Sequence, residues 1–365
     1  MDITHIDVEG YEKVVRAVDP ESGLHALIAV HDTTLGPALG GMRMWPYGSE
    51  GEAMNDVLRL SRGMTFKSAV ADTGLGGGKS VIIGDPVAHK SEALFEAMGS
   101  FVESLGGLYI TAEDVNTTVP DLEVVQRRTN YVTGLSRDSG SSGNPSPYTA
   151  DGCVIGFRSC LKQALGSESF DGLTFAFQGA GAVGGPMAQA VADEGGTVLV
   201  ADINAGRAQK VAENTGGTVV PIEEILFVEC DVLSPCAMGA AFDDETIPAL
   251  HTKVIAGCAN NQLAEPRHAD MLRERGILYA PDYVINAGGI INVSVELLPG
   301  GYDEDEARVR IGRIYDNLQE VFSIADEDGV STREAAFRLA KRRLAQGRSE
   351  DSRSLNHLPT GDQVD

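Results

Sequence analysis

The sequence predicts a two-domain α/β protein whose second half contains a parallel, doubly wound sheet. The chain has 365 residues, which exceeds the size at which a single hydrophobic core usually keeps growing. Residues 140–147 form a run of Gly, Ser, Asn and Pro that cannot continue a helix or a strand. From residue 174 onward, strand-like and helix-like segments alternate at short spacing, as a parallel sheet requires.

The first half has the pattern of an α/β domain of its own. Residues 24–30 and 80–83 are apolar and predict strands. Residues 50–63 and 91–105 carry apolar side chains at helical spacing behind acidic N-termini, and residues 118–128 predict a further helix.

The second half begins with a predicted helix over residues 149–165, entered from the glycine-rich loop. Residues 307–345 predict a pair of amphipathic helices rich in Arg and Glu, and the polar residues that follow predict a disordered tail. We predict that residues 1–139 form a first domain, residues 140–150 a hinge loop and residues 151–330 a dinucleotide-binding domain. We expect residues 331–345 to form a helix that returns toward the first domain, and residues 346–365 to form the tail.

The net charge of −24 and the pI near 4.6 exclude nucleic acid as a partner, because phosphate binding requires clustered Lys and Arg. Anionic membranes are disfavoured for the same reason. No apolar run reaches the 18 residues that a membrane span requires, and the acidic start differs from a signal peptide. We therefore expect a soluble protein without a membrane partner.

The cysteines and histidines favour a cytoplasmic location and no metal. The five cysteines are odd in number, form no CxxC pair and stand in apolar surroundings, which favours free thiols in a reducing compartment. The seven histidines show no ligand spacing typical of a metal site.

A dinucleotide-binding turn is predicted where a strand at residues 174–178 meets a GxGxxG pattern and a helix-forming segment. Gly179 allows the tight turn, Gly181 lets the backbone approach a pyrophosphate, and Gly184 allows close packing of helix on strand. The free N–H groups of the helix start would face the phosphates. The candidate cofactor-binding residues in this turn are Gly179, Ala180, Gly181, Ala182, Val183, Gly184 and Gly185.

Asp202 ends the next predicted strand, 23 residues after Gly179. A carboxylate there would bind the ribose hydroxyls and repel a 2′-phosphate, so the sequence predicts NAD rather than NADP. The alternative is a purely structural strand–turn–helix with a capping aspartate.

Two lysines, Lys67 and Lys79, stand twelve residues apart in an apolar, glycine-flanked segment, although 21 of the 29 basic residues are Arg. A desolvated lysine can lose its proton whereas arginine cannot, which indicates amine chemistry. The alternative is one solvated lysine and one loop lysine. A phosphate-binding P-loop ending at Ser80 would require a glycine where Thr73 stands, so residues 76–79 predict a glycine-walled pocket for a small substrate.

Over residues 10 to 345 the chain resembles the glutamate/leucine/phenylalanine/valine dehydrogenase family, and its branched-chain members most closely. The motifs occur in the family's order, at residues 35–41, Lys67, residues 76–79, 113–115, 140–145, 259–262 and 286–289. One departure is Thr73, where the family usually has an aliphatic residue. The resemblance implies an NAD-dependent homo-oligomeric enzyme that converts an L-amino acid to a 2-oxo acid.

The resemblance also implies roles for individual residues. Lys67, assisted by Asn261, would pair with the substrate α-carboxylate, and Lys79 would activate water. Asp114 would exchange protons with the substrate amine, and Thr149 and Asn260 would lie near the nicotinamide. Two alternatives stay open: Asp114 could cap the following helix, and Asn260 and Asn261 could be ordinary turn residues.

The substrate pocket implied by the family is uncharged, which favours an aliphatic substrate over glutamate. Its residues would be Leu39, Gly40, Ala112, Ile290 and Val293, with Gly41 and Met64 beside them. Relatives that accept phenylalanine tend to have glycine at Ala112, so we expect leucine, valine and isoleucine. The alternatives are a phenylalanine dehydrogenase and a catalytically silent NAD-binding regulator.

Overall fold

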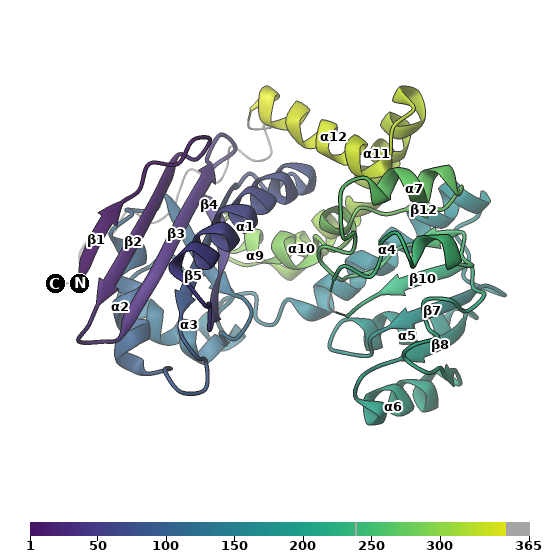
Figure 1. Cartoon of the computed structure of the whole chain (residues 1–365), viewed down its shortest axis with the longest axis horizontal. Coiled ribbons are helices and arrows are strands. Elements are labelled where there is room, and N and C mark those ends of the chain that lie inside the picture. Colours follow the sequence, from purple (N-terminus) through teal and green to yellow (C-terminus); the bar gives the residue numbers. More distant parts are fainter. Residues whose placement is uncertain (238, 348–365) are drawn as a thin grey trace. The chain divides into compact units, whose positions relative to one another are not determined.

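The computed structural model describes residues 1–237 and 239–347 (Figure 1). Residue contacts divide the chain into two compact units. Unit 1 comprises Met1–Asn144, Val293–Glu304 and the C-terminal segment from Ala340, and unit 2 comprises Pro145–Asn292 and Asp305–Leu339. None of the helices in the described part of the chain combines the length and apolar content needed to cross a bilayer.

Unit 1 is built on a six-stranded mixed sheet with the order β1-β2-β3-β5-β4-β6. β4 runs parallel to its neighbours β5 and β6, whereas the pairs from β1 to β5 are antiparallel. The strands are β1 (Asp2–His5), β2 (Lys13–Asp19), β3 (Leu24–Asp32), β4 (Ala38–Trp45), β5 (Gly76–Ile83) and β6 (Tyr109–Glu113).

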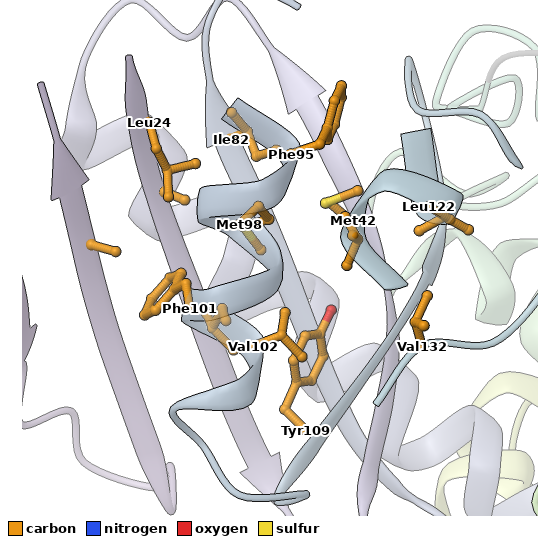
Figure 2. Close-up of a cluster of buried hydrophobic side chains, with 14 of the residues drawn as sticks. Leu24, Met42, Ile82, Phe95, Met98, Phe101, Val102, Tyr109, Leu122 and Val132 are labelled. Atoms are coloured by element: carbon orange, nitrogen blue, oxygen red, sulfur yellow. The ribbon is translucent and has the colours of Figure 1, made fainter. Parts of the chain in front are cut away.

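Helices cover both faces of this sheet. The helix α1 (Glu50–Ala71) packs through Ala53 and Val57 on one face, formed partly by Leu27 and Ala29. On the opposite face, α2 (Glu92–Glu103) and α3 (Val119–Gln126) enclose a larger core (Figure 2). Figure 2 shows its side chains, among them Leu24, Met42, Ile82, Phe95, Met98, Phe101, Val102, Tyr109, Leu122 and Val132.

The helix α1 extends beyond the predicted end at Gly63. Ser49 caps its start by accepting from the Glu52 N–H at 3.2 Å, and the backbone leaves the helix at Asp72, where φ is 49°. The last two turns continue because their inward side chains, Thr65 and Ser68 among them, are buried. Met64 and Lys67 are consequently helical residues.

Residues 76–79 belong to strand β5, so this strand begins four residues before the predicted start at Ser80. The strand pairs with β3 on one side and β4 on the other. A β-carbon on Gly77 would overlap the backbone of Thr65 in α1. The glycines therefore let a helix and a central strand approach closely, and local composition alone could not separate this from a loop.

Unit 2 contains a six-stranded, fully parallel sheet with the order β12-β11-β10-β7-β8-β9, which confirms the predicted doubly wound architecture. The strands are β7 (Thr174–Gln178), β8 (Thr197–Ala201), β9 (Thr218–Val219), β10 (Val232–Pro235), β11 (Val254–Ile255) and β12 (Leu278–Tyr279). The helices before residue 300 are α4 (Ser146–Leu165), α5 (Gly184–Asp193), α6 (Ala205–Thr215), α7 (His268–Glu274), α8 (Asp282–Ile285) and α9 (Gly288–Val295).

The C-terminal segment forms three helices rather than the predicted pair: α10 (Glu304–Gly312), α11 (Ile314–Asp328) and α12 (Thr332–Gln346). Gly312 ends the first of them, since glycine is a poor helix former. The predicted disordered tail lies, from residue 348 onward, outside the described residues.

The predicted domain at residues 151–330 is continuous, whereas residue contacts assign Val293–Glu304 to unit 1. Glu296 gives the physical reason. Its carboxylate accepts hydrogen bonds from the Gly134 N–H at 3.0 Å, the Ser142 N–H at 3.0 Å and the Ser141 hydroxyl at 2.6 Å. One side chain thus attaches the segment after α9 to residues 134–142. The functional boundaries of the domains stay a prediction.

Replacing Glu296 with alanine should lower the free energy of unfolding of unit 1 by about 1–3 kcal/mol, because it leaves two backbone N–H groups without their partner. Urea denaturation of the full chain, followed by hydrogen exchange at residues 134–142, measures this. Glu123→Ala, an exposed substitution on α3, is the matched control. Equal stability of the two variants would contradict the anchoring role.

Candidate active site

A buried ion pair between Lys79 and Asp114 is the centre of the site in unit 1. Lys79 lies on β5 and Asp114 directly follows β6. The Lys79 Nζ is 2.7 Å from the Asp114 Oδ2, and the two side chains are 6% and 23% exposed. An ammonium this far out of water requires such a partner.

The pair forms across β4, which lies between β5 and β6 in the sheet. Gly40 and Gly41 occupy β4 at this point, and Gly41 is in register with Ala112 of β6. A β-carbon on Gly41 would lie 2.6 Å from the Asp114 Cβ, and one on Gly40 would overlap the Gly78 carbonyl. The absence of a side chain at Gly41 therefore leaves room for the Asp114 side chain, and its absence at Gly40 lets the backbones of β4 and β5 approach closely.

Arg43 extends the pair into a network that sequence reasoning missed. Its Nε donates to the Asp114 Oδ2 at 3.0 Å and its Nη1 donates to the Asp56 Oδ2 at 2.8 Å. The Tyr47 hydroxyl donates to the same Asp56 oxygen at 2.7 Å. Arg43 stands two positions after Gly41 and therefore lies on the same face of β4. This spacing could predict a contact with Asp114 only if it were already known that Asp114 lies beside Gly41.

The network sets the protonation of its members. Burial lowers the pKa of Lys79, with a smaller contribution from Arg43, and the opposing effect of Asp114 does not restore it. Burial acts to raise the pKa of Asp114, but Lys79 and Arg43 outweigh it and hold that pKa below its usual value. Asp114 is thus a carboxylate beside an amine that releases its proton more readily than a solvated lysine.

The alternative role of Asp114 as a helix cap does not match the structure. The helix α3 starts at Thr118, whose backbone N–H donates to Asp121 at 2.9 Å. The Asp114 backbone N–H instead donates to the Thr117 hydroxyl at 2.9 Å. The Asp114 side chain is therefore committed to Lys79 and Arg43.

The remaining predicted substrate residues divide between the units. In unit 1, Leu39, Gly40 and Gly41 are buried on β4, Ala112 is half-buried on β6, Met64 and Lys67 are half-buried on α1, and Val293 is buried on α9. In unit 2, Ile290 is buried on α9, and Asn261 adopts a left-handed backbone with φ of 54°. Each set is described within its own unit.

The glycine turn of unit 2 has the geometry that a dinucleotide requires. Gly179 ends β7 with φ of 115°, a conformation that side chains disfavour. A β-carbon on Gly184 would overlap the Gly179 carbonyl, whereas one on Gly181 would meet no heavy atom within 4 Å. The turn is therefore closed toward the protein and open at Gly181, where a pyrophosphate would approach. Ala180, Ala182, Val183 and Gly185 complete the turn.

Asp202 is tied to this turn. Its Oδ2 accepts from the Ala180 N–H at 2.8 Å and its Oδ1 accepts from the Asn204 N–H at 2.7 Å. Asn204, rather than Asp202, caps α6 by accepting from the Arg207 N–H at 3.2 Å. Because a carboxylate has about four acceptor positions, Asp202 can hold the turn and still accept from a ribose.

Asn260 and Thr149 belong to two further short networks in unit 2. The Asn286 side-chain amide donates to the Asn260 Oδ1 at 2.7 Å and to the Cys258 carbonyl at 3.1 Å. The Thr149 hydroxyl donates to the Pro145 carbonyl at 3.0 Å, and a β-carbon on Gly289 would lie 2.8 Å from that hydroxyl. The starts of α4 and α9 are thus in close contact.

Within residues 1–237 and 239–347, no group of three or more His, Cys, Asp or Glu side chains is placed to hold a metal ion. A parallel sheet with a glycine turn, together with a separate unit that carries a buried amine and carboxylate, is typical of two-unit dehydrogenases that use a nicotinamide dinucleotide.

Comparisons with known proteins specify the family. Residues 12–131 match the Glu/Leu/Phe/Val dehydrogenase dimerisation domain, and residues 201–351 match the Glutamate/Leucine/Phenylalanine/Valine dehydrogenase domain. The chain is 51% identical to a leucine dehydrogenase from Geobacillus stearothermophilus over 353 residues, which are 97% of this chain and 96% of the relative. It is 46% identical to a phenylalanine dehydrogenase from Bacillus thermotolerans, over 96% and 91% of the two chains.

The crystal structure of L-tryptophan dehydrogenase from Nostoc punctiforme superposes with a TM-score of 0.82 at 42% identity, over 92% of this chain and 96% of that one. The protein is thus an amino-acid dehydrogenase. It belongs to the Glu/Leu/Phe/Val dehydrogenase family, as the resemblance of its motifs indicated.

Replacing Lys79 with alanine should lower kcat/KM by about two to four powers of ten, the usual cost of losing a general base. NADH affinity should stay nearly unchanged, because the glycine turn belongs to unit 2. Wild-type kcat/KM should rise with pH as the amine loses its proton, at a pH below the ordinary lysine value of about 10.4. Lys79→Arg should abolish this rise, since arginine stays charged.

Steady-state kinetics across pH and NADH titration by fluorescence test both parts. Lys210→Ala, at an exposed lysine on α6, is the matched control and should behave as wild type. Activity of Lys79→Ala within about threefold of wild type would refute the assignment.

Proposed function

We propose that the protein catalyses the NAD-dependent oxidative deamination of leucine, valine and isoleucine to the 2-oxo acid and ammonium, and the reverse reductive amination. The observation that carries this proposal is the buried Lys79–Asp114 pair beside the uncharged positions Gly41 and Ala112. The 51% identity to a leucine dehydrogenase over nearly the whole chain supports the same substrate class.

The reaction consumes an amino acid, NAD⁺ and water, and it yields the 2-oxo acid, ammonium, NADH and a proton. The dinucleotide, when bound, accepts the hydride that leaves the substrate Cα. Lys67 pairs with the substrate α-carboxylate. This pairing orients the Cα for hydride loss.

Lys79 and Asp114 transfer the protons of the reaction. The neutral amine of Lys79 takes a proton from the water that attacks the imino carbon, and the resulting ammonium stabilises the oxygen of the carbinolamine. Asp114 exchanges a proton with the substrate nitrogen as it leaves. Because the two groups are 2.7 Å apart, a proton can pass between them without entering solvent.

The charges around the pocket favour an aliphatic side chain. In unit 1, Leu39, Gly40, Ala112 and Val293 carry no charge, and Arg43 already has two carboxylate partners in Asp114 and Asp56. The γ-carboxylate of glutamate would therefore be desolvated without a cation of its own. Phenylalanine is the second candidate, supported by the 46% identical relative, and the methyl group of Ala112 favours the smaller side chains.

NAD is favoured over NADP because the Asp202 carboxylate would face a 2′-phosphate. The bound cofactor would lie along the open side of Gly181, with Thr149 and Asn260 near the nicotinamide. We propose a homo-oligomer, in line with the match of residues 12–131 to a dimerisation domain. A cytoplasmic location fits the five cysteines, all of which are free thiols.

The proposal is tested by following NADH absorbance with L-leucine, L-valine, L-isoleucine, L-phenylalanine and L-glutamate, with D-leucine as the control. We expect turnover of the three branched-chain substrates, and kcat/KM for glutamate lower by about a hundredfold or more, since its charge would be buried unpaired. NAD should be preferred to NADP. Turnover of glutamate alone would refute the pocket argument, and no turnover of any amino acid would support a silent regulator.

The variant Ala112→Gly should raise activity on phenylalanine and lower it on leucine, because it deepens the pocket by one methyl group. One methyl group discriminates by about 1–3 kcal/mol, so the ratio of the two kcat/KM values should shift by roughly tenfold to two-hundredfold. Kinetics on both substrates with both proteins measure this ratio. An unchanged ratio would mean that Ala112 does not touch the substrate side chain.

A further inference from the structure

Two thiols lie at the carboxyl end of the unit 2 sheet, beside the glycine turn. Cys236 directly follows β10, and Cys258 comes three residues after β11, the neighbouring parallel strand. Beyond the ladder, the Ala256 N–H still donates to the Leu233 carbonyl at 3.0 Å, so the strands stay adjacent. The register of the two strands, Val232 with Val254 and Leu233 with Ile255, brings Cys236 opposite Cys258. Neighbouring strands are about 4.8 Å apart, within the usual Cα separation of disulfides.

Cys236 is in direct contact with the turn. Its backbone N–H donates to the Gln178 carbonyl at 2.8 Å. A β-carbon on Gly179 would lie 2.8 Å from the Cys236 carbonyl carbon, and one on Gly184 would lie 3.0 Å from the Cys236 Cβ. The first and last glycines of the turn therefore pack on this cysteine with no spare room.

Cys258 is connected to the other end of the proposed cofactor site. Its carbonyl accepts from the Asn286 amide, which also donates to the Asn260 side chain. Movement of Cys258 would therefore disturb the position of Asn260. The two thiols join the part of the site assigned to the pyrophosphate to the part assigned to the nicotinamide.

The two thiols differ in reactivity from the other cysteines of the unit. Both residues are half-buried, whereas Cys153, Cys160 and Cys230 are buried. The hydrogen bond from Cys258 lowers the pKa of Cys236 and raises that of Cys258. By contrast, burial raises the pKa of Cys230 to about 11. Cys236 is thus the nucleophile and Cys258 keeps its proton.

We propose that Cys236 and Cys258 form an oxidative modification site that reacts with a small hydroperoxide, and that the disulfide formed there weakens dinucleotide binding. This inference rests on the proposed dinucleotide site. It would make dinucleotide binding sensitive to peroxide, a property that hydride transfer itself does not require.

The reaction proceeds in two balanced steps. The Cys236 thiolate attacks the terminal oxygen of the hydroperoxide, the O–O bond breaks, and water or an alcohol leaves after taking up a proton. The sulfur of Cys258 then attacks the Cys236 sulfenic acid, so that an S–S bond forms, the S–O bond breaks and water departs with the thiol proton. The two thiols lose two electrons in total, and the hydroperoxide gains them.

The disulfide would alter the turn because its two β-carbons must lie about 3.8 Å apart. A disulfide prefers a Cα separation of about 5.5–6 Å, whereas neighbouring strands lie about 4.8 Å apart. Meeting that preference moves the Cys236 backbone, against which Gly179 and Gly184 pack. Since neither glycine has spare room on that side, the turn must follow, and the N–H groups that would meet the phosphates lose their arrangement. A thiol reductant reverses the change.

The experiment treats the full-length protein with hydrogen peroxide and measures three quantities. Thiol titration should fall from five to three per chain, and peptide mapping should find Cys236 joined to Cys258. The dissociation constant for NADH, measured by fluorescence, should rise by about tenfold or more, and dithiothreitol should restore it. Mapping the wild-type protein keeps the test independent of whether any variant folds.

Cysteine variants test whether the loss of NADH binding after peroxide depends on the Cys236–Cys258 disulfide. In Cys258→Ser the treated-to-untreated ratio of NADH dissociation constants should stay near one, whereas Cys230→Ser, the matched buried control, should keep the wild-type ratio. Cys153→Ser should also keep it, because Cys153 is buried and its thiol contacts the Ile285 carbonyl at 3.5 Å.

A disulfide joining other cysteines, oxidation without a Cys236–Cys258 bond, or a bond that leaves NADH binding unchanged would each overturn the inference. If the proposed function itself were wrong, the experiment would give a different result. The reduced protein would then not bind NADH or oxidise any amino acid, whatever peptide mapping finds after peroxide.

Discussion

The ion pair of Lys79 with Asp114 across β4 is the interaction on which the proposed chemistry of this protein depends. Two charges removed from water are expensive, and a buried pair is often no more stable than apolar residues of similar size. The fold nevertheless has a glycine, Gly41, where a side chain would collide with Asp114. That arrangement is understandable if the pair serves proton transfer, because burial lowers the pKa of Lys79 and the amine then releases its proton more readily to a neighbouring group.

In the proposed reaction the two units have separate tasks. Unit 1 carries the buried Lys79–Asp114 pair, on the strands of a mixed sheet in which β4 has glycine at positions 40 and 41. Unit 2 holds the turn suited to a dinucleotide, at the carboxyl end of a parallel sheet. Both sites use glycine for the same physical reason, the close approach of backbone to a reacting molecule or to another element. Changes to one site should therefore be separable from changes to the other by kinetics and cofactor binding.

The thiols of unit 2 show how the same end of a parallel sheet can serve two purposes. Strand ends gather there because every strand of the sheet runs in the same direction, so side chains that follow β10 and β11 become neighbours. Cys236 and Cys258 occupy that edge next to the glycine turn. A covalent change between them acts on the turn through packing alone, since neither thiol is needed for hydride transfer.

The sequence by itself determined the parallel sheet of unit 2, the turn at Gly179 and the acidic residue at Asp202, because these features depend on local period and turn chemistry. Its motifs also indicated the family. It took the tertiary fold to show that residues 76–79 are a strand, that Arg43 donates to Asp114, and that Cys236 lies opposite Cys258. Each of these depends on which strand lies beside which. Strand order is set by non-local packing across the sheet, and a short stretch of sequence carries no record of its distant neighbour.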